Sequence, residues 1–171
     1  RGQWNLVDIL LEPLMEKVAK AKIADARMEK ALVLLERVMQ YSWKNEENER
    51  GDNILSLFYR IRSGELKKSE SVVVMTGSIQ DKGIQRASLP KLLAGCLEHP
   101  ADSALAHRLI YQGPVAVRFL VDSLISTEDA DDRMKIIDLL TECTTFLPQI
   151  IHERLPAHMP WYGKRNLIKL L

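Results

Sequence analysis

Two stretches in the second half of the chain repeat each other at a spacing of 31 residues. Residues 113–124 read GPVAVRFLVDSL and residues 144–155 read TTFLPQIIHERL, and their apolar positions coincide. An acidic pair, Asp122 and Glu153, also falls at the same position. Apolar residues that recur every three or four positions predict an amphipathic helix in both stretches. Such a repeat constrains the fold strongly, because it implies one structural unit used several times.

The helices that follow these stretches correspond as well. Residues 131–140 match residues 162–171, with Arg133 and Arg165 placed 32 residues apart. A weaker copy, residues 101–110, precedes the first stretch. Each unit of about 31 residues is therefore predicted to be a pair of antiparallel helices, which cannot bury its apolar face alone and must stack on its neighbours.

A recurring pattern within residues 89–171 points to a known family. Its residues are Gly113, Val117, Leu120 and Leu124 in the first helix, Asp132, Arg133, Ile137 and Leu140 in the second, and the string WYGKRNLIKLL from Trp161. This pattern resembles the bacterial HEAT-like repeats, the group that includes the phycobilisome-lyase-type repeats. The resemblance implies an all-α fold, an α-α superhelix in which stacked antiparallel helix pairs form a HEAT-like solenoid with a concave partner-binding surface. Pro148 departs from the pattern and is expected to interrupt a helix.

The N-terminal part of the chain is predicted to be helical too. Apolar residues recur at helical spacing across residues 4–43, and Pro13 predicts a break near Glu12 because proline lacks the N–H that a helix interior uses. The polar run at 44–52 predicts a solvated loop, after which Asn53 would cap a short helix.

A second polar run, residues 63–71, predicts the domain boundary. Residues 1–68 would form an N-terminal helical segment and residues 69–171 the HEAT-like repeats. The first segment could dock on the repeats or mediate self-association, and docking is the commoner arrangement. Leu171 ends the sequence within a predicted helix where a solenoid would carry a polar cap, so a C-terminally truncated segment of a larger protein is expected.

Charge and cysteine usage exclude several classes of protein. The chain of 171 residues has 24 Lys+Arg and 23 Asp+Glu, so neither half forms a basic nucleic-acid footprint. Its longest central run without charged residues, 71–80, is too short to span a membrane, and no secretory signal opens the sequence. Cys96 and Cys143 are expected to be buried, reduced thiols, which favours a cytoplasmic location.

No catalytic constellation is predicted. The glycine-rich phosphate loops and the G-x-S-x-G nucleophile motif are absent, and no cofactor or small-molecule substrate is indicated. HEAT-like hydroxylases bind iron through several His-Glu pairs, but this chain has only His152-Glu153. The C-x-x-H spacing of Cys96 and His99 supplies two of the four ligands that a structural zinc site needs. We therefore expect no metal site and no enzymatic activity in this segment.

Six residues of the repeats are the candidates for partner binding: Arg133, Lys135, Trp161, Tyr162, Lys164 and Arg165. Together with Lys169 they could also serve a HEAT-like nucleic-acid-binding or DNA-processing domain, but the acidic residues at 129, 131, 132 and 138 argue against that interpretation. A purely structural interpretation is open for two of them. Arg133 and Arg165 could pair with acidic residues such as Asp102 and Asp132 in a ladder along the stack, and Trp161 would pack between repeats.

These observations predict a non-catalytic protein-protein interaction scaffold from a larger cytoplasmic bacterial protein. The alternatives are the nucleic-acid-binding domain and, less favoured, a metal-dependent hydroxylase-like enzyme. The partner, the number of repeats and the oligomeric state stay open.

Overall fold

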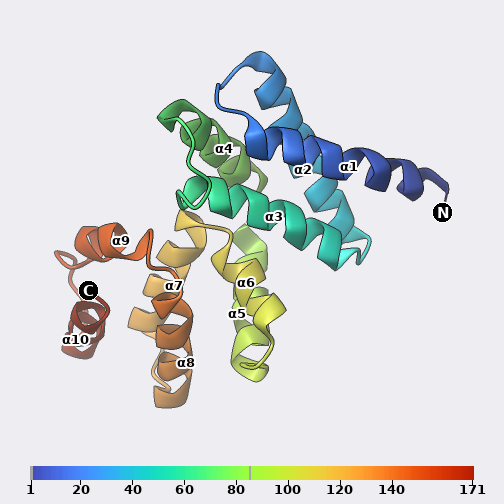
Figure 1. Cartoon of the computed structure of the whole chain (residues 1–171). Helices are drawn as coiled ribbons and strands as arrows, with labels where there is room; N and C mark the ends of the chain where they lie inside the picture. The colour runs from blue at the N-terminus through green and yellow to red at the C-terminus, as the bar shows by residue number, and fades with distance from the viewer. Residues whose placement is uncertain (1, 85) are drawn as a thin grey trace. The chain divides into compact units, whose positions relative to one another are not determined.

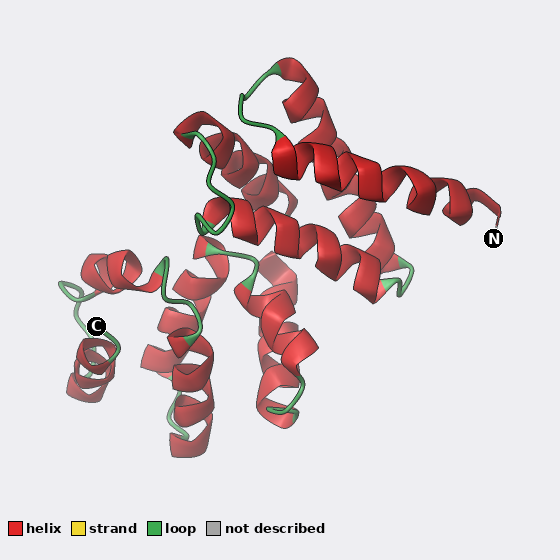
Figure 2. Cartoon of the chain, viewed as in Figure 1, coloured by secondary structure: helices red, strands yellow, loops and turns green. Residues whose placement is uncertain are grey.

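The computed structural model describes residues 2–84 and 86–171, with side chains from Ile9 onward. Within these residues all regular structure is helical and no strand occurs (Figure 2), which confirms the predicted all-α class. The chain divides into two compact units, residues 1–84 and residues 85–171. Each unit is described by itself below.

Four helices form the first unit (Figure 1). They are α1 (Gly2–Lys20), α2 (Ala26–Lys44), α3 (Asn48–Arg62) and α4 (Glu70–Gly83). Helix α2 contacts the other three. Leu32 and Leu35 on its apolar stripe are fully buried, as are Phe58 and Ile61 of α3 and Val72 of α4. Apolar residues at helical spacing are buried together in this way because each helix has one apolar face to remove from water.

Helix α4 belongs to the first unit, which thus continues past the predicted boundary at residue 68. The Arg62 guanidinium in α3 donates at 2.8 Å to both Gln80 Oε1 and Asp81 Oδ1 in α4. Gln40 Nε2 in α2 donates at 2.9 Å to the carbonyl of Gly83. The polar run at 63–69 is therefore a connection inside one unit rather than a linker between two. The β-branched residues Val72–Val74 lie in this helix.

Two predicted breaks in the first unit are wrong. Helix α1 continues through Pro13. Because proline has no N–H, the carbonyl of Ile9 one turn earlier lacks its helical partner. Both residues are exposed, so water can hydrate this carbonyl. Helix α3 begins at Asn48, which leaves only a short turn after α2 and puts Asn53 inside the helix. This early start is held by Trp43, whose Nε1 donates at 3.0 Å to Asp52 Oδ1.

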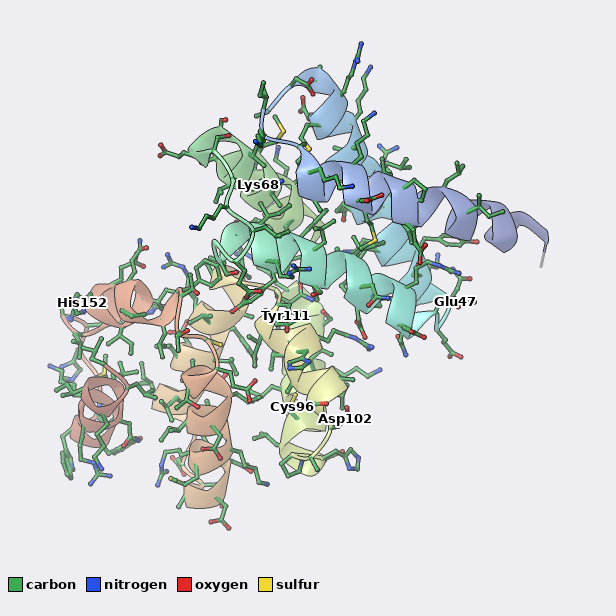
Figure 3. All side chains as sticks on the ribbon, viewed as in Figure 1. Glu47, Lys68, Cys96, Asp102, Tyr111 and His152 are labelled. Carbon is green, nitrogen blue, oxygen red and sulfur yellow. The ribbon has the colours of Figure 1, made fainter. Side chains whose placement is uncertain are left out.

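Lys68 fastens the C-terminal end of α1. Its ammonium donates to the carbonyls of Val18 at 3.3 Å and Ala21 at 2.6 Å, and also to the carbonyl of Ala19 (Figure 3). A cation is favourable there because the last carbonyls of a helix carry partial negative charge and lack intrahelical partners. Burial, with the neighbouring charge of Lys22, lowers the pKa of Lys68.

Replacing Lys68 with methionine is expected to lower the free energy of unfolding by about 1–2 kcal/mol, because three carbonyls lose a charged donor while the apolar stem is kept. Urea unfolding followed by circular dichroism measures the effect. The control is Lys67→Met at the adjacent exposed position, which is expected to change stability by less than about 0.5 kcal/mol. Equal effects of the two substitutions would show that Lys68 does not hold the end of α1.

The second unit contains η1 and six α-helices. They are η1 (Arg86–Ser88), α5 (Leu89–Glu98), α6 (Ser103–Ile110), α7 (Pro114–Ser126), α8 (Ala130–Thr141), α9 (Leu147–Arg154) and α10 (Trp161–Lys169). The predicted helices are present, since α7 and α9 cover the two aligned first stretches and α8 and α10 the two second ones. Helices α7 and α8 pack as a pair, whereas α10 makes its main helix contact with α7 rather than with α9. Pro148 does not interrupt α9, because it lies in the first turn, where no N–H is needed.

Helix α7 is central to this unit and contacts α6, α8, α9 and α10. Its residues Val117, Leu120 and Leu124 are fully buried. Two ion pairs connect α7 to α9: Arg118 to Glu153 at 2.5 Å and Asp122 to Arg154 at 2.7 Å. In the view of Figure 1, α9 lies across the direction of α7 and α8.

Candidate functional site

Four of the six candidate residues form two arginine-aromatic pairs. The Arg165 guanidinium lies 5.0 Å from the centre of the Trp161 ring, and that of Arg133 lies 5.6 Å from the Tyr162 ring. A guanidinium at this distance is attracted to the electron-rich face of an aromatic ring. Both residues of the first pair belong to α10, and they meet because residues four apart share a helix face. The second pair joins α8 to α10.

Helix α10 has a buried side and an open side. The buried side carries Gly163, Asn166 and Leu167. A side chain at Gly163 would contact Met159 and Ile125 of α7. On the open side, Trp161 is 70% exposed and Ile168 is 60% exposed. We call this surface the α10 face and define it by Trp161, Lys164, Arg165, Ile168 and Lys169. Trp161 does open the helix as predicted, but it does not pack between repeats.

Lys135 lies elsewhere, although it is only two residues from Arg133. Its ammonium donates at 2.9 Å to the carbonyl of Leu97 at the end of α5 and lies 3.6 Å from Asp132 Oδ1. Two residues correspond to a rotation of about 200° around a helix, so the two cations point to different neighbours. Lys135 thus joins α8 to α5 and is not part of the α10 face.

The acidic ladder proposed for Arg133 is not formed. Arg133 Nη1 donates to the carbonyls of Thr127 at 3.1 Å and Glu128 at 2.5 Å, just after α7 ends. Asp102 instead caps α6 by accepting from the backbone N–H groups of residues 104 and 105, and Asp132 pairs with Lys135. Arg133 therefore has a structural role at the α7–α8 connection, whereas Arg165 contacts only the exposed Trp161 among the interactions described.

Cys96 and His99 line a small cavity of about 180 Å³ beside the α5–α6 loop. Asp102, His107 and Lys135 line it too, and Figure 3 shows Cys96 and Asp102 close together. Burial, with the negative charge of Asp102, raises the pKa of the Cys96 thiol, which disfavours the thiolate that a metal would require. No group of three or more potential ligands that could hold a metal occurs among the residues described.

His152 is exposed on α9 and lies apart from the Cys96 cavity (Figure 3). Its neighbour Glu153 is held by Arg118 at 2.5 Å and accepts a hydrogen bond from Gln149 at 3.1 Å. The hydrogen bond from Arg118 lowers the pKa of Glu153. This carboxylate is thus engaged in joining α7 to α9, which accounts for it without a metal.

Cys143 is buried as predicted, in the loop between α8 and α9. Its Sγ donates at 3.3 Å to the Leu139 carbonyl, and burial, with a smaller effect of Glu142, raises its pKa from 9.0 to about 12. The folded state therefore keeps a proton that the unfolded state releases above pH 9. The stabilising contribution is complete below pH 9 and is lost as the pH rises towards 12.

The free energy of unfolding of the native chain is expected to fall above pH 9 by up to about 1.4 kcal/mol per pH unit more steeply than that of Cys143→Ala. Urea unfolding of both proteins between pH 8 and pH 11 gives the two slopes. Comparing slopes removes the constant cost of the substitution and the titration of the shared lysines and tyrosines. Parallel slopes would contradict a raised pKa at Cys143.

Sequence reasoning missed Ile168 as a member of the α10 face and named Lys169 only as a candidate for nucleic-acid binding. A signal was present, because residues 154–171 contain Arg154, Lys164, Arg165 and Lys169 but no aspartate or glutamate. The spacing of Trp161, Arg165 and Ile168 would also have placed them on one side of a helix.

No family model, curated protein or solved structure matches the chain. Among the residues described, no helix combines the length and the apolar character needed to cross a membrane.

Proposed function

We propose that the chain is a non-catalytic protein-protein interaction scaffold, whose second unit is a HEAT-like solenoid and whose α10 face binds an acidic segment of a protein partner. The observation that carries this proposal is the exposed Trp161 held under the Arg165 guanidinium on a helix without acidic residues. We retain the larger cytoplasmic bacterial protein as the proposed context.

Repetition supports the solenoid part of the proposal. The sequence repeat coincides with helices, and the aligned helices α7 and α9 are in contact. The aligned acidic residues Asp122 and Glu153 both form ion pairs between these two helices. The two ion pairs run in opposite directions, so they join α7 to α9, and the coincidence of the sequence repeat with helices is what supports the solenoid.

Composition of the α10 face supports an acidic protein partner. Trp and Arg are the residue types that contribute most to binding at protein interfaces, and here they are adjacent and exposed. Lys164, Arg165 and Lys169 supply positive charge with no acidic residue on the same helix. The exposed Ile168 adds an apolar contact that favours a protein segment over the phosphate backbone of a nucleic acid.

The test uses three fluorescein-labelled amphipathic helical peptides of 18 residues, with identical leucine and phenylalanine positions and with glutamate, glutamine or lysine at every polar position. Fluorescence anisotropy measures their binding to the whole chain. We expect the glutamate peptide to bind at least tenfold more tightly than the glutamine peptide and the lysine peptide not to bind. Trp161→Ala and Arg165→Glu are each expected to weaken glutamate-peptide binding about tenfold or more, the size typical of a central interface residue.

Lys91→Glu is the matched control, because it makes the same charge change as Arg165→Glu at an exposed position of α5 instead of α10. It should bind the glutamate peptide as the native chain does. Arg165→Glu is preferred to Arg133→Glu because Arg133 also supports the α7–α8 connection. Equal binding of the three peptides, or equal losses with Lys91→Glu, would overturn the proposal. Tighter, steeply salt-dependent binding of a single-stranded DNA through the same residues would favour the nucleic-acid alternative instead.

A further inference from the structure

A groove with an apolar lining lies in the first unit between α1 and α2. Its volume is about 500 Å³, and its apolar side chains include Leu14, Val18, Ile23, Met28 and Leu34. Ile23 is 74% exposed and Leu34 is 51% exposed, so apolar surface is open to solvent here. Apolar surface of this kind, bordered by polar residues, is typical of an interaction site. The groove is separate from the α10 face and has no part in the function proposed above.

Positive charge is distributed along the whole groove. Its lining includes four cations, which come from α1, from the connecting segment and from α2: Lys17, Lys22, Arg27 and Lys30. None of them forms an ion pair among the residues described. The one carboxylate of the lining, Asp25, accepts from the backbone N–H groups of residues 27 and 28 as the cap of α2. The groove therefore favours a negatively charged occupant, and two copies that met groove to groove would repel each other.

The turn between α2 and α3 has the opposite charge. Residues 44–49 contain three glutamates and one lysine. Glu46, Glu47 and Glu49 are all exposed, and Glu46 and Glu49 form no ion pair within the described part of the chain. Tyr41, in the last turn of α2, is 54% exposed and adds an aromatic ring beside these carboxylates. We call residues 41–49 the acidic turn.

The groove and the acidic turn belong to opposite ends of α2. The lining residues of α2 lie between Arg27 and Leu34, whereas the turn follows Lys44. The helix has 19 residues and is therefore about 28 Å long. Figure 3 shows the same separation, because Glu47 of the turn lies far from Lys68, which binds the end of α1 beside the groove. One copy cannot place its own turn in its own groove, whereas a second copy can.

Both surfaces are held by hydrogen bonds within the unit. In the acidic turn, the backbone N–H of Glu47 donates at 2.9 Å to the carbonyl of Ser42. At the groove, Ser69 Oγ donates at 3.2 Å to the carbonyl of Lys22. Neither surface has to become ordered when the two meet, which removes one cost of association.

We propose that the α1–α2 groove binds the acidic turn of a second copy of this chain, with Glu46 and Glu49 near the cations of the groove and Tyr41 against its apolar lining. Charge complementarity favours this occupant, because the turn brings carboxylates to cations that form no ion pair within the chain. Its aromatic ring covers aliphatic side chains that are otherwise exposed. The two surfaces differ, so the contact is heterologous and copies join head to tail.

Sedimentation velocity of the whole chain over a range of concentrations tests the proposal. The mean mass is expected to rise with concentration at low salt and to fall towards that of the monomer in about 0.5 M sodium chloride, because salt screens exposed charges. Two double variants each disable one surface: Lys22→Gln with Lys30→Gln in the groove, and Glu46→Gly with Glu49→Gln in the turn. Each is expected to weaken self-association at least tenfold.

A 1:1 mixture of these two variants is the sharpest test. The groove variant keeps a native turn and the turn variant keeps a native groove, so one native contact can form between them. The mixture is expected to form a dimer and nothing larger, at concentrations where either variant alone is a monomer. A mixture that stays monomeric would overturn the proposal.

Glu46→Gly alone separates lost association from lost folding. Glu46 has a φ of 63°, and it is the one non-glycine residue with a positive φ in the part of the chain that the structure describes. Glycine adopts this conformation more readily than glutamate does. The substitution should therefore raise the urea midpoint of unfolding while it weakens self-association. A lower midpoint together with weaker association would assign the loss to folding and contradict a direct contact of Glu46.

Matched controls remove the same charges at exposed positions of α4 and α5. They are Lys82→Gln with Lys91→Gln for the groove, and Glu70→Gln with Glu98→Gln for the turn. Both should self-associate as the native chain does, and so should Trp161→Ala, which makes failure here distinguishable from failure of the α10 proposal. A chain that is monomeric at every concentration, or equal losses in the controls, would overturn the proposal. Stronger association of the groove variant than of the native chain would indicate contact from groove to groove and would also contradict it.

Discussion

Replacing Leu120 with alanine is expected to lower the free energy of unfolding by about 2–5 kcal/mol, the largest effect of any substitution considered for this chain. Leu120 is fully buried at the centre of α7, the helix that contacts four others in the second unit. Removing three side-chain carbons there loses apolar burial and leaves a cavity that neighbouring helices can fill only in part. Urea unfolding at equilibrium measures the loss.

Met134→Ala provides the comparison, because Met134 is on α8 in the same unit and is 59% exposed. Its effect should stay below about 1 kcal/mol, as for surface positions generally. Ile151, which aligns with Leu120 in the sequence repeat and is also fully buried, should be as sensitive to alanine as Leu120. A small effect at Leu120, similar to that at Met134, would show that α7 is not the centre of this unit.

The second large effect is expected for Gly51→Ala, which should destabilise the chain by about 2–3 kcal/mol. Alanine normally stabilises a helix relative to glycine by about 1 kcal/mol, and Gly51 lies within α3. A methyl group at Gly51, however, would lie 2.5 Å from Cδ1 of the Trp43 indole. The bulky ring must move, which costs packing energy and weakens the hydrogen bond from Trp43 Nε1 to Asp52.

Gly163→Ala is the opposite case. Gly163 is a helical glycine in α10, and a methyl group there would lie 3.6 Å from Met159 Sδ, an ordinary contact distance. This substitution should raise stability by about 0.5–1 kcal/mol. Thermal unfolding of the two variants should therefore move in opposite directions, and a stabilising Gly51→Ala would contradict the close approach of Trp43 to α3.

Helices and buried residues could be predicted well because both follow from local periodicity. Leu32, Leu35 and Leu120 are at apolar positions of helical repeats, and all three are fully buried. Cys96 and Cys143 were predicted to be buried thiols and are. These predictions need only the spacing of apolar residues and no knowledge of which helix packs on which.

Helix ends and the division of the chain were predicted less well, because they depend on contacts between segments distant in sequence. The residues 48–52 are polar and look like a loop, yet Trp43 packs on Gly51 and extends α3 through them. The run 63–69 looks like a linker, yet Arg62 binds α4 back onto α3. Tertiary contacts of this kind override local preference, and the sequence pattern does not contain them.

Candidate site residues were predicted in part. Trp161 and Arg165 share one helix face by their spacing, so their pairing on the α10 face follows from the sequence. The contact of Arg133 with Tyr162 and that of Lys135 with the Leu97 carbonyl link separate helices. Such contacts depend on how α8 packs. For this reason the six predicted residues separate into three on the α10 face, the Arg133–Tyr162 pair between α8 and α10, and Lys135, which faces α5.

The most direct test of the proposed scaffold function is hydrogen-deuterium exchange of the whole chain, read by mass spectrometry, with and without saturating glutamate peptide. Binding at the α10 face predicts slower exchange in α10 and at the start of α8, where Arg133 contacts Tyr162, with other helices unchanged. The same peptide should cause no slowing in Trp161→Ala. Slowing confined to other helices, or unchanged exchange in α10 under conditions where anisotropy shows the peptide bound, would contradict the α10 face as the binding surface.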